Sequence, residues 1–261
     1  MSASPSCGVL QICVQSALEG DQSSLSAHRL LNDIAARTAA TLCELQLPVT
    51  WALSNHTIES LSGIFTSGLS QQEMALLADA SWCSPETSRR TLVGELCRRL
   101  DLFRNQDLDV STLVLSDTDV GRHVEALPKA GIQVVRRQVD ELINRRTRST
   151  ANPRYGVLMV TPSAVIPGRP GLLVRWDCAY SAKQGLWKSV SQRSAQHVVI
   201  DLGKLVALPK SHMRRFHRWL RLVARLKNAG RLEIELVKDA TSRRYPSGKQ
   251  NSSHSILRPA A

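Results

Sequence analysis

The sequence lacks several features that would assign it to a common functional class. Aromatic residues make up only 4% of its 261 residues, which leaves few rings on which single-stranded nucleic acid bases could stack. Its six cysteines form no Cys-x-x-Cys pair, so neither a zinc knuckle nor a thioredoxin-like motif is indicated. No two histidines have the His-x-x-x-His spacing that places a metal-binding pair on one helix face. Helix-turn-helix, zinc-finger and RNA-recognition signatures are also missing.

Long apolar runs are absent as well. No stretch approaches the ~18 apolar residues that cross a bilayer, and residues 1–14 lack the charged start of a secretory signal. We therefore expect no membrane partner. Scattered cysteines without a secretory signal are typical of a reducing compartment, and we predict a cytoplasmic protein. These cysteines are Cys7, Cys13, Cys43, Cys83, Cys97 and Cys178.

The excess of positive over negative charge lies entirely in the second half of the chain. The formal net charge is +12. Residues 1–118 contain 7 basic and 13 acidic residues, a net charge of −6, whereas residues 119–261 contain 27 basic and 9 acidic residues, a net charge of +18. This asymmetry indicates an anionic partner or a basic tail. Arginines that merely cover solvated faces would give the same count.

Apolar runs and helical periodicities alternate along most of the chain. Because strand–helix–strand units pair their strands in parallel, the alternation predicts an α/β fold with a parallel sheet. The pattern alone does not separate a barrel from a doubly wound sheet. Strands are predicted at residues 8–16, 49–53, 110–115, 132–135, 197–202 and 232–237, and helices at residues 26–45, 71–77, 86–103, 120–130, 140–148 and 209–229.

The domain organisation predicted from composition is simple. Residues 152–196 are rich in Pro and Gly and form an insertion or hairpin region within one domain over residues 8–244. Residues 245–261 are rich in small and polar residues, which predicts a disordered basic tail.

Several scaffold segments carry a family resemblance. Residues 45–53 read LQLPVTWAL, residues 73–76 read EMAL, residues 129–132 read KAGI, and residues 197–205 read HVVIDLGKL before a helix and the segment AGRLEI at 229–234. In their order and their pattern of residue types, these segments resemble the polysaccharide deacetylase family, the NodB-homology domain, over nearly the whole chain. The resemblance implies an irregular β/α barrel of parallel strands alternating with helices.

The resemblance also implies a chemistry that this sequence has lost. The family holds a divalent metal with one Asp and two His, and uses a second Asp as base and a late His as acid. The metal polarises the carbonyl and activates water, while the side chains move protons. Here Cys13-Val14-Gln15-Ser16-Ala17 stands where the family has its Asp-Asp pair. Trp82 and Glu86 occupy the two His positions, Ser116-Asp117-Thr118-Asp119 replaces an Arg-x-Pro segment, and Asp201 takes the place of the late His.

These departures predict a polysaccharide deacetylase-like protein that is catalytically inactive or divergent and linked to carbohydrate metabolism. No three imidazole or thiolate groups keep a zinc-binding spacing, so we expect no metal, no cofactor and no catalytic residue. An active protein would hydrolyse carbon–nitrogen bonds other than peptide bonds. The candidate degenerate pocket consists of Glu19, Asp21, Asp79, Ser81, Trp82, Glu86 and Asp201.

Carboxylates and histidines leave other interpretations open. A relocated hydrolytic site could use Glu19, Asp21, Asp79 and Asp201, although Asp is also common in turns and caps. Asp201 stands in an apolar strand, where a buried carboxylate needs a partner. His212 and His217 are five residues apart and cannot share a metal on one helix face, so solvent exposure is expected for both. His56 follows a predicted strand and could cap it or line the sheet edge.

A row of basic residues follows one face of the predicted helix at 209–229. Their spacing of four, four, three and four residues keeps them together, and guanidinium groups suit phosphate, sulfate or uronate. The row predicts, as an alternative function, a binding module for an anionic polymer, either an acidic glycan or a nucleic acid. An ordinary solvated outer helix would show the same pattern, and no oligomeric state is indicated. The row consists of Lys210, Arg214, Arg218, Arg221 and Arg225.

Overall fold

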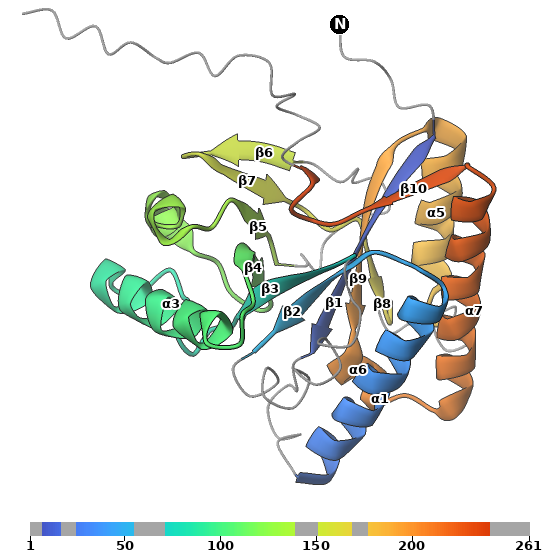
Figure 1. The fold of residues 1–261 in the computed structure, drawn as a ribbon, viewed down its shortest axis with the longest axis horizontal. Helices are drawn as coiled ribbons and strands as arrows, with labels where there is room; N and C mark the ends of the chain where they lie inside the picture. Colours follow the sequence, from blue (N-terminus) through green and yellow to red (C-terminus); the bar gives the residue numbers. More distant parts are fainter. Residues whose placement is uncertain (1–6, 17–24, 55–70, 139–150, 169–176, 241–261) are drawn as a thin grey trace, which may run out of the picture.

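The computed structural model describes residues 7–16, 25–54, 71–138, 151–168 and 177–240 (Figure 1). The elements in chain order are β1 (Gly8–Ser16), α1 (Leu25–Glu44), β2 (Val49–Leu53), β3 (Gln72–Ala78), α3 (Arg89–Arg104), β4 (Val110–Leu115), β5 (Val134–Arg136), β6 (Ala151–Arg154), β7 (Val157–Val160), β8 (Ala164–Ile166), α5 (Tyr180–Gln192), β9 (Ala195–Asp201), α6 (Leu202–Val206), α7 (Lys210–Asn228) and β10 (Leu232–Glu235). The predicted helix at 140–148 and the predicted tail at 245–261 lie outside the described residues.

Ten strands form one curled sheet in the order β6-β7-β5-β4-β3-β2-β1-β9-β8, with β10 paired to β1. Only the β6–β7 pair is antiparallel; every other recorded pairing is parallel. The curled sheet is a half-barrel, and helices alternate with its strands. This arrangement confirms the predicted irregular β/α barrel. Helices α1, α5, α6 and α7 gather at one end of the sheet, and α3 lies at the other (Figure 1).

The two faces of the sheet are filled differently. Large side chains such as Leu10, Ile12 and Trp51 point outward and form the main core with residues of the helices. The inner face carries a smaller cluster of mostly small apolar residues, including Cys13, Ala52 and Ala75, to which no described helix contributes a buried residue. Strands buried on both faces read as near-continuous apolar runs, which explains why sequence patterns located most of them.

Two local predictions were wrong. Residues 71–77 were expected to be helical, but they form the central strand β3. The segment consists of Gln, Glu, Met, Ala and Leu, which are strong helix formers, and burial between β2 and β4 overrides this preference. Residues 120–130 form two short 3₁₀ segments, Gly121–Ala126 and Pro128–Ala130, in place of one α-helix. The predicted stop at Gly131 is confirmed, because its φ is +92°.

The Pro/Gly-rich middle contributes to the main sheet. Strand β7 pairs with β5, β8 pairs with β9, and β6 and β7 form an antiparallel pair. Helix α5 packs against β1 and β8. The region therefore supplies both ends of the sheet.

Candidate functional site

Gln15, at the carboxyl end of β1, forms hydrogen bonds with side chains of two other strands. One is the adjacent strand β9, and the other is β5, which is separated from β1 by three strands. Gln15 Nε2 donates to Asp201 Oδ2 on β9 at 2.9 Å. Gln15 Oε1 accepts from Arg136 Nη2 on β5 at 2.6 Å. All three side chains are almost fully buried, with exposures of 6% for Gln15, 3% for Asp201 and 0% for Arg136. A neutral amide thus links a buried carboxylate to a buried guanidinium on the inner face.

Asp201 is fully engaged by this network and by the helix that follows it. Its Oδ1 accepts from the backbone N–H of Lys204 at 3.1 Å and caps α6. Its Oδ2 lies 3.5 Å from Lys204 Nζ in addition to the bond from Gln15. The prediction that a carboxylate in this apolar strand needs a partner is confirmed. Asp201 therefore stabilises the end of β9 through three groups.

Arg136 is a buried cation that the sequence pattern did not place in the candidate site. Burial lowers the pKa of its guanidinium, and the Asp201 charge opposes that shift. Arginine nevertheless stays protonated at neutral pH. Its Nη1 donates to the carbonyl of Arg137 at 3.2 Å, while Nε has no partner in the described part of the chain. Burial also raises the pKa of the neighbouring Cys13 thiol to about 11, so this cysteine stays protonated and unreactive.

His197 lies on the same inner face, four residues before the end of β9 at Asp201. It is fully buried, and its Nδ1 lies 3.3 Å from Gln11 Oε1. Because an amide oxygen only accepts, Nδ1 carries the proton, and Nε2 has no partner among the described residues. Burial, together with the Arg136 charge, lowers the pKa of His197 to about 3. The ring is therefore neutral at physiological pH.

The segment after β3 places its polar residues in turns. Asp79 Oδ1 accepts from the Ser81 backbone N–H at 2.9 Å and from its hydroxyl. Asp117, after β4, accepts from the Ala80 backbone N–H at 3.3 Å, and Asp119 accepts from that of Gly121. Asp79 and Asp119 cap their own turns, which is the ordinary use of Asp that the sequence left open, and Asp117 links its loop to the segment after β3.

Trp82 and Glu86 do not face a shared site. Trp82 is buried in the outer core, and the Arg99 guanidinium of α3 lies 4.7 Å from its ring centroid. Glu86 is exposed on the turn that precedes α3. The two positions where the resemblance places metal-binding His residues therefore carry a packed indole and a solvated carboxylate.

The remaining candidates are separated or outside the described residues. Asp79 follows β3 and Asp201 ends β9, with β2 and β1 between these strands. Glu19, Asp21 and His56 lie outside the described residues. Within the described ranges no three His, Cys, Asp or Glu side chains come together as a possible metal site. The residues present there do not fit the divalent metal that the resemblance implies.

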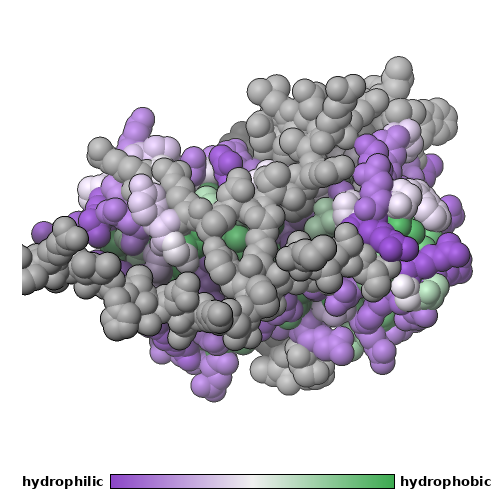
Figure 2. All heavy atoms as spheres, turned by 90° about the horizontal axis from the view of Figure 1, so that it is seen from above, coloured by the Kyte–Doolittle hydropathy of each residue, from purple (hydrophilic) through white to green (hydrophobic). Residues whose placement is uncertain are grey.

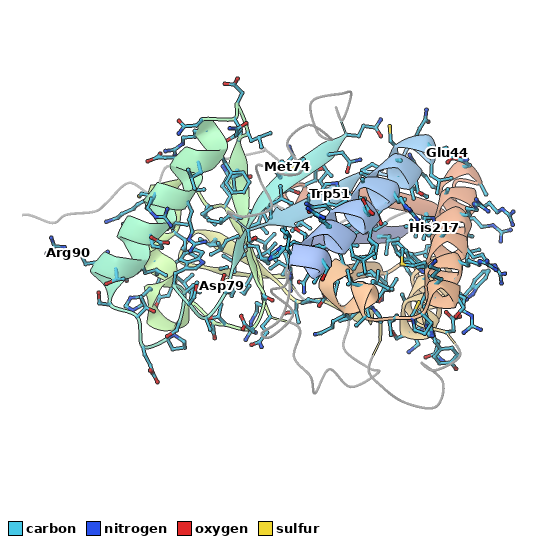
Figure 3. The ribbon with its side chains drawn as sticks, turned by 90° about the horizontal axis from the view of Figure 1, so that it is seen from below. Glu44, Trp51, Met74, Asp79, Arg90 and His217 are labelled. Carbon is cyan, nitrogen blue, oxygen red and sulfur yellow. The ribbon has the colours of Figure 1, made fainter. Side chains whose placement is uncertain are left out.

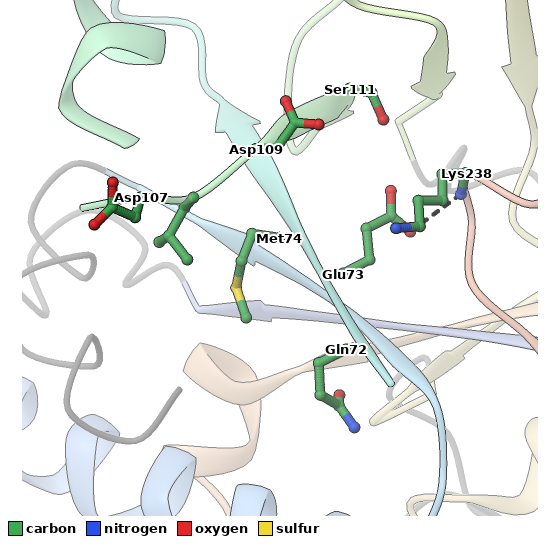
Figure 4. A pocket seen from close by; sticks show the side chains of 8 residues that line it. Gln72, Glu73, Met74, Asp107, Asp109, Ser111 and Lys238 are labelled. Atoms are coloured by element: carbon green, nitrogen blue, oxygen red, sulfur yellow. Dashed lines mark hydrogen bonds between the residues drawn. The ribbon is translucent and has the colours of Figure 1, made fainter. Parts of the chain in front are cut away.

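A pocket of about 220 Å³ opens at the opposite, amino-terminal edge of β3 and β4 (Figure 4). Its walls include Gln72, Glu73, Met74, Asp109 and Lys238. Glu73 is buried and accepts hydrogen bonds from Thr50 at 2.6 Å, from Thr112, and from the Lys238 backbone N–H at 3.0 Å. Desolvation raises the pKa of Glu73 while these bonds oppose the rise. Its oxygens tether the segment after β10, a role that the predicted helix at 71–77 did not indicate.

The basic row predicted on the last long helix is exposed on α7. Figure 3 shows nitrogen-tipped side chains extending from α7 away from the body of the protein, while His217 lies on the side next to α1. His217 Nδ1 is 3.3 Å from the Thr41 hydroxyl of α1.

His212, near the start of α7, is only 7% exposed. The start of this helix packs against Cys178, whose thiol donates a hydrogen bond to the His212 carbonyl. The expected exposure of His212 was therefore wrong.

Comparisons with known proteins identify the fold. No family model and no curated protein matches the sequence. A Mycobacterium smegmatis protein assigned as a polysaccharide deacetylase superimposes with a TM-score of 0.69 at 11% identity, over 100% of this chain and 97% of that chain. This chain has a polysaccharide deacetylase fold. The resemblance stated from the scaffold segments is confirmed at the level of the fold.

Two further solved structures share this architecture. A 4-alpha-glucanotransferase from Thermococcus litoralis matches with a TM-score of 0.62 at 10% identity, over 90% of this chain and 40% of that chain. A mutant of BA3943, described as a CE4 family pseudoenzyme with restored enzymatic activity, matches with a TM-score of 0.51 at 8% identity, over 90% of this chain and 68% of that chain. At these identities the shared property is the fold.

None of the helices in the described ranges is both long enough and apolar enough to cross a membrane.

Proposed function

We propose that this chain is a polysaccharide deacetylase-like protein that acts in carbohydrate metabolism by binding polysaccharide, without metal-dependent deacetylation. The fold shared with the Mycobacterium smegmatis protein supports the link to polysaccharide. The polar residues at the strand ends support the loss of the hydrolytic chemistry. We place the carbohydrate at the carboxyl ends of the strands, where ligands bind in α/β folds.

The observation that carries the proposal is the Gln15 bridge between Asp201 and Arg136. By the resemblance, the segment Cys13-Val14-Gln15-Ser16-Ala17, which contains Gln15, stands where the family has its Asp-Asp pair, and Asp201 stands in place of the late His. An amide neither takes up a proton at neutral pH nor supplies the charge that a divalent cation requires. Both oxygens of Asp201 already accept hydrogen bonds. The network therefore leaves neither a free base nor a free acid at this position.

A second support is the existence of a pseudoenzyme with this fold. The BA3943 protein is named a CE4 family pseudoenzyme, and the solved form is a mutant with restored activity. The fold thus persists in a protein that has lost its activity. The residues of a site, rather than the fold, determine function. The residues at the strand ends therefore decide whether this chain can catalyse deacetylation.

The proposal is tested on the purified chain with N-acetylated chitin oligosaccharides. We expect binding in isothermal titration calorimetry, no stoichiometric zinc, cobalt or nickel by mass spectrometry, and no acetate release with or without added metal. Asp79→Ala, at the end of β3, should weaken binding, whereas Asp101→Ala, on the exposed face of α3, should not. Acetate release would overturn the loss of hydrolysis, and release without metal would favour the relocated carboxylate site. Absence of binding would overturn the carbohydrate role.

A further inference from the structure

The outer face of α7 carries five cations and no anion. Helical geometry places Lys210, Arg214, Arg218, Arg221 and Arg225 within a sector of about 80° and along about 22 Å of the helix axis. All five are exposed. The helix sequence contains no Asp or Glu, and none of the five makes an ion pair within the described residues. We call this row the α7 arginine face.

Arginines without an acidic partner are not the rule in this protein, as a comparison of α7 with α3 shows. On α3, Arg98 and Arg99 both pair with Glu95, and Arg104 pairs with Asp101. Like charges spaced three and four residues apart destabilise a helix, and α3 offsets them with acids. Helix α7 instead tolerates the repulsion, because Phe216, Trp219 and Leu220 anchor its opposite side in the core. The α7 arginine face is thus a charged surface on a helix whose opposite side is buried in the core.

Figure 2 shows strongly hydrophilic side chains at the end of the molecule that holds α5 and α7. The aromatic residues of α7, Phe216 and Trp219, are both fully buried, so the face offers no ring for base stacking. A single-stranded nucleic acid therefore lacks the stacking contacts that it uses on proteins. The face is suited to a polymer that is recognised through its charges.

The spacing of the cations on α7 distinguishes between two remaining ligands, duplex DNA and an acidic polysaccharide. Consecutive cations lie about 4.5–6 Å apart along the helix axis, whereas each strand of duplex DNA carries one negative charge per about 3.4 Å of its axis. A polyuronate carries one carboxylate on each sugar, a sparser repeat that suits a row of separate guanidinium groups. Guanidinium binds carboxylate in a bidentate manner. We infer that the α7 arginine face binds an acidic polysaccharide through its carboxylates, a step that rests on the proposed carbohydrate role.

The test uses polygalacturonate as the probe and two variants of equal charge. Arg214, Arg218, Arg221 and Arg225 are changed to Gln together in the α7 variant. The control changes Arg89, Arg90, Arg98 and Arg104 on α3 to Gln, which removes the same charge elsewhere. We expect the α7 variant to bind at least about tenfold more weakly at low salt and to show a flatter salt dependence, and the control to bind like the wild type. Circular dichroism confirms that both variants are folded.

Each contrary outcome has a defined meaning. An equal loss in both variants would overturn the inference, because net charge alone would then explain binding, and so would the absence of any polygalacturonate binding. Tighter binding of duplex DNA through the same arginines would replace the acidic polysaccharide by a nucleic acid. The neutral chitin oligosaccharides separate the two proposals: if they bind while polygalacturonate does not, only the α7 inference fails. If the reverse holds, only the proposed strand-end function fails.

Discussion

Gln15 and Asp201 lie on adjacent parallel strands and are joined by a hydrogen bond of 2.9 Å from the amide to the carboxylate. The two residues are also register partners in the β1–β9 pair. Gln15 at the same time accepts from Arg136, so one amide satisfies a cation and an anion that the fold has removed from water. A buried charge without a partner is strongly destabilising, which makes Gln15 the central residue of the inner face.

The first prediction concerns this bridge. Gln15→Leu removes one partner from Arg136 and one from Asp201, and we expect a loss of about 2–4 kcal/mol in the free energy of unfolding. Combining it with Asp201→Ala should reveal a coupling of about 0.5–3 kcal/mol, measured by urea denaturation. The matched cycle pairs Gln15→Leu with Asp101→Ala, which is remote and exposed. A coupling no larger than in that cycle would show that the bridge does not act as a unit.

The second prediction concerns the tether made by Glu73. Its carboxylate holds two threonine hydroxyls and the Lys238 backbone N–H, and Thr50 also accepts from the Val237 backbone N–H at 3.0 Å. Glu73→Ala leaves these buried donors without an acceptor and should cost about 2–4 kcal/mol. Hydrogen exchange of the Val237 and Lys238 amides should accelerate in the variant.

Glu125 on the protein surface provides the comparison for this tether. It pairs with Arg89, and both side chains are about half exposed. Glu125→Ala should change the free energy of unfolding by no more than about 0.5 kcal/mol. Comparable losses in the two variants, or unchanged exchange at Val237 and Lys238, would contradict the tether.

Sequence patterns predicted the fold largely because the strands are buried on both faces and read as apolar runs. The segments at 8–16, 49–53 and 110–115 coincide with β1, β2 and β4. The segment that was wrongly predicted as a helix is β3, whose helix-forming residues are held in a strand by its neighbours on both sides. No local signal identifies such a segment, since the deciding contacts come from Thr50 and Thr112, 23 and 39 residues away.

The candidate site was predictable only in part. Asp201 stood out as a carboxylate in an apolar strand, and its need for a partner was correctly inferred. Arg136 did not stand out, because Arg136-Arg137 reads as a surface basic pair while only Arg136 points inward. Which of two adjacent residues faces the interior depends on the strand register, and a shift of one residue exchanges the two faces.

The third prediction compares two glycines in different surroundings. A Cβ at Gly8 would lie 2.7 Å from the Ser189 carbonyl oxygen of α5, so Gly8→Ala must push β1 and α5 apart and should cost about 1–3 kcal/mol. Gly94 lies in the interior of α3, where a Cβ would meet no heavy atom within 4 Å apart from its chain neighbours and the adjacent backbone of the helix. Gly94→Ala should instead stabilise the protein by about 0.5–1 kcal/mol. Thermal unfolding measures both, and shifts of the same sign would contradict the close packing of β1 on α5.

The fourth prediction concerns acid sensitivity. His197 is buried, and its pKa is lowered to about 3 from the ordinary value of 6.5. Between these values the unfolded chain binds a proton that the folded chain does not, so stability is complete above pH 6.5 and falls as the pH decreases. The expected loss is at most about 1.4 kcal/mol per pH unit, or about 2 kcal/mol between pH 6.5 and pH 5. Urea denaturation across this range measures the slope, which His197→Gln should reduce and His28→Gln on α1 should leave unchanged. Equal slopes in the wild type and His197→Gln would show that the buried imidazole does not cause the acid sensitivity.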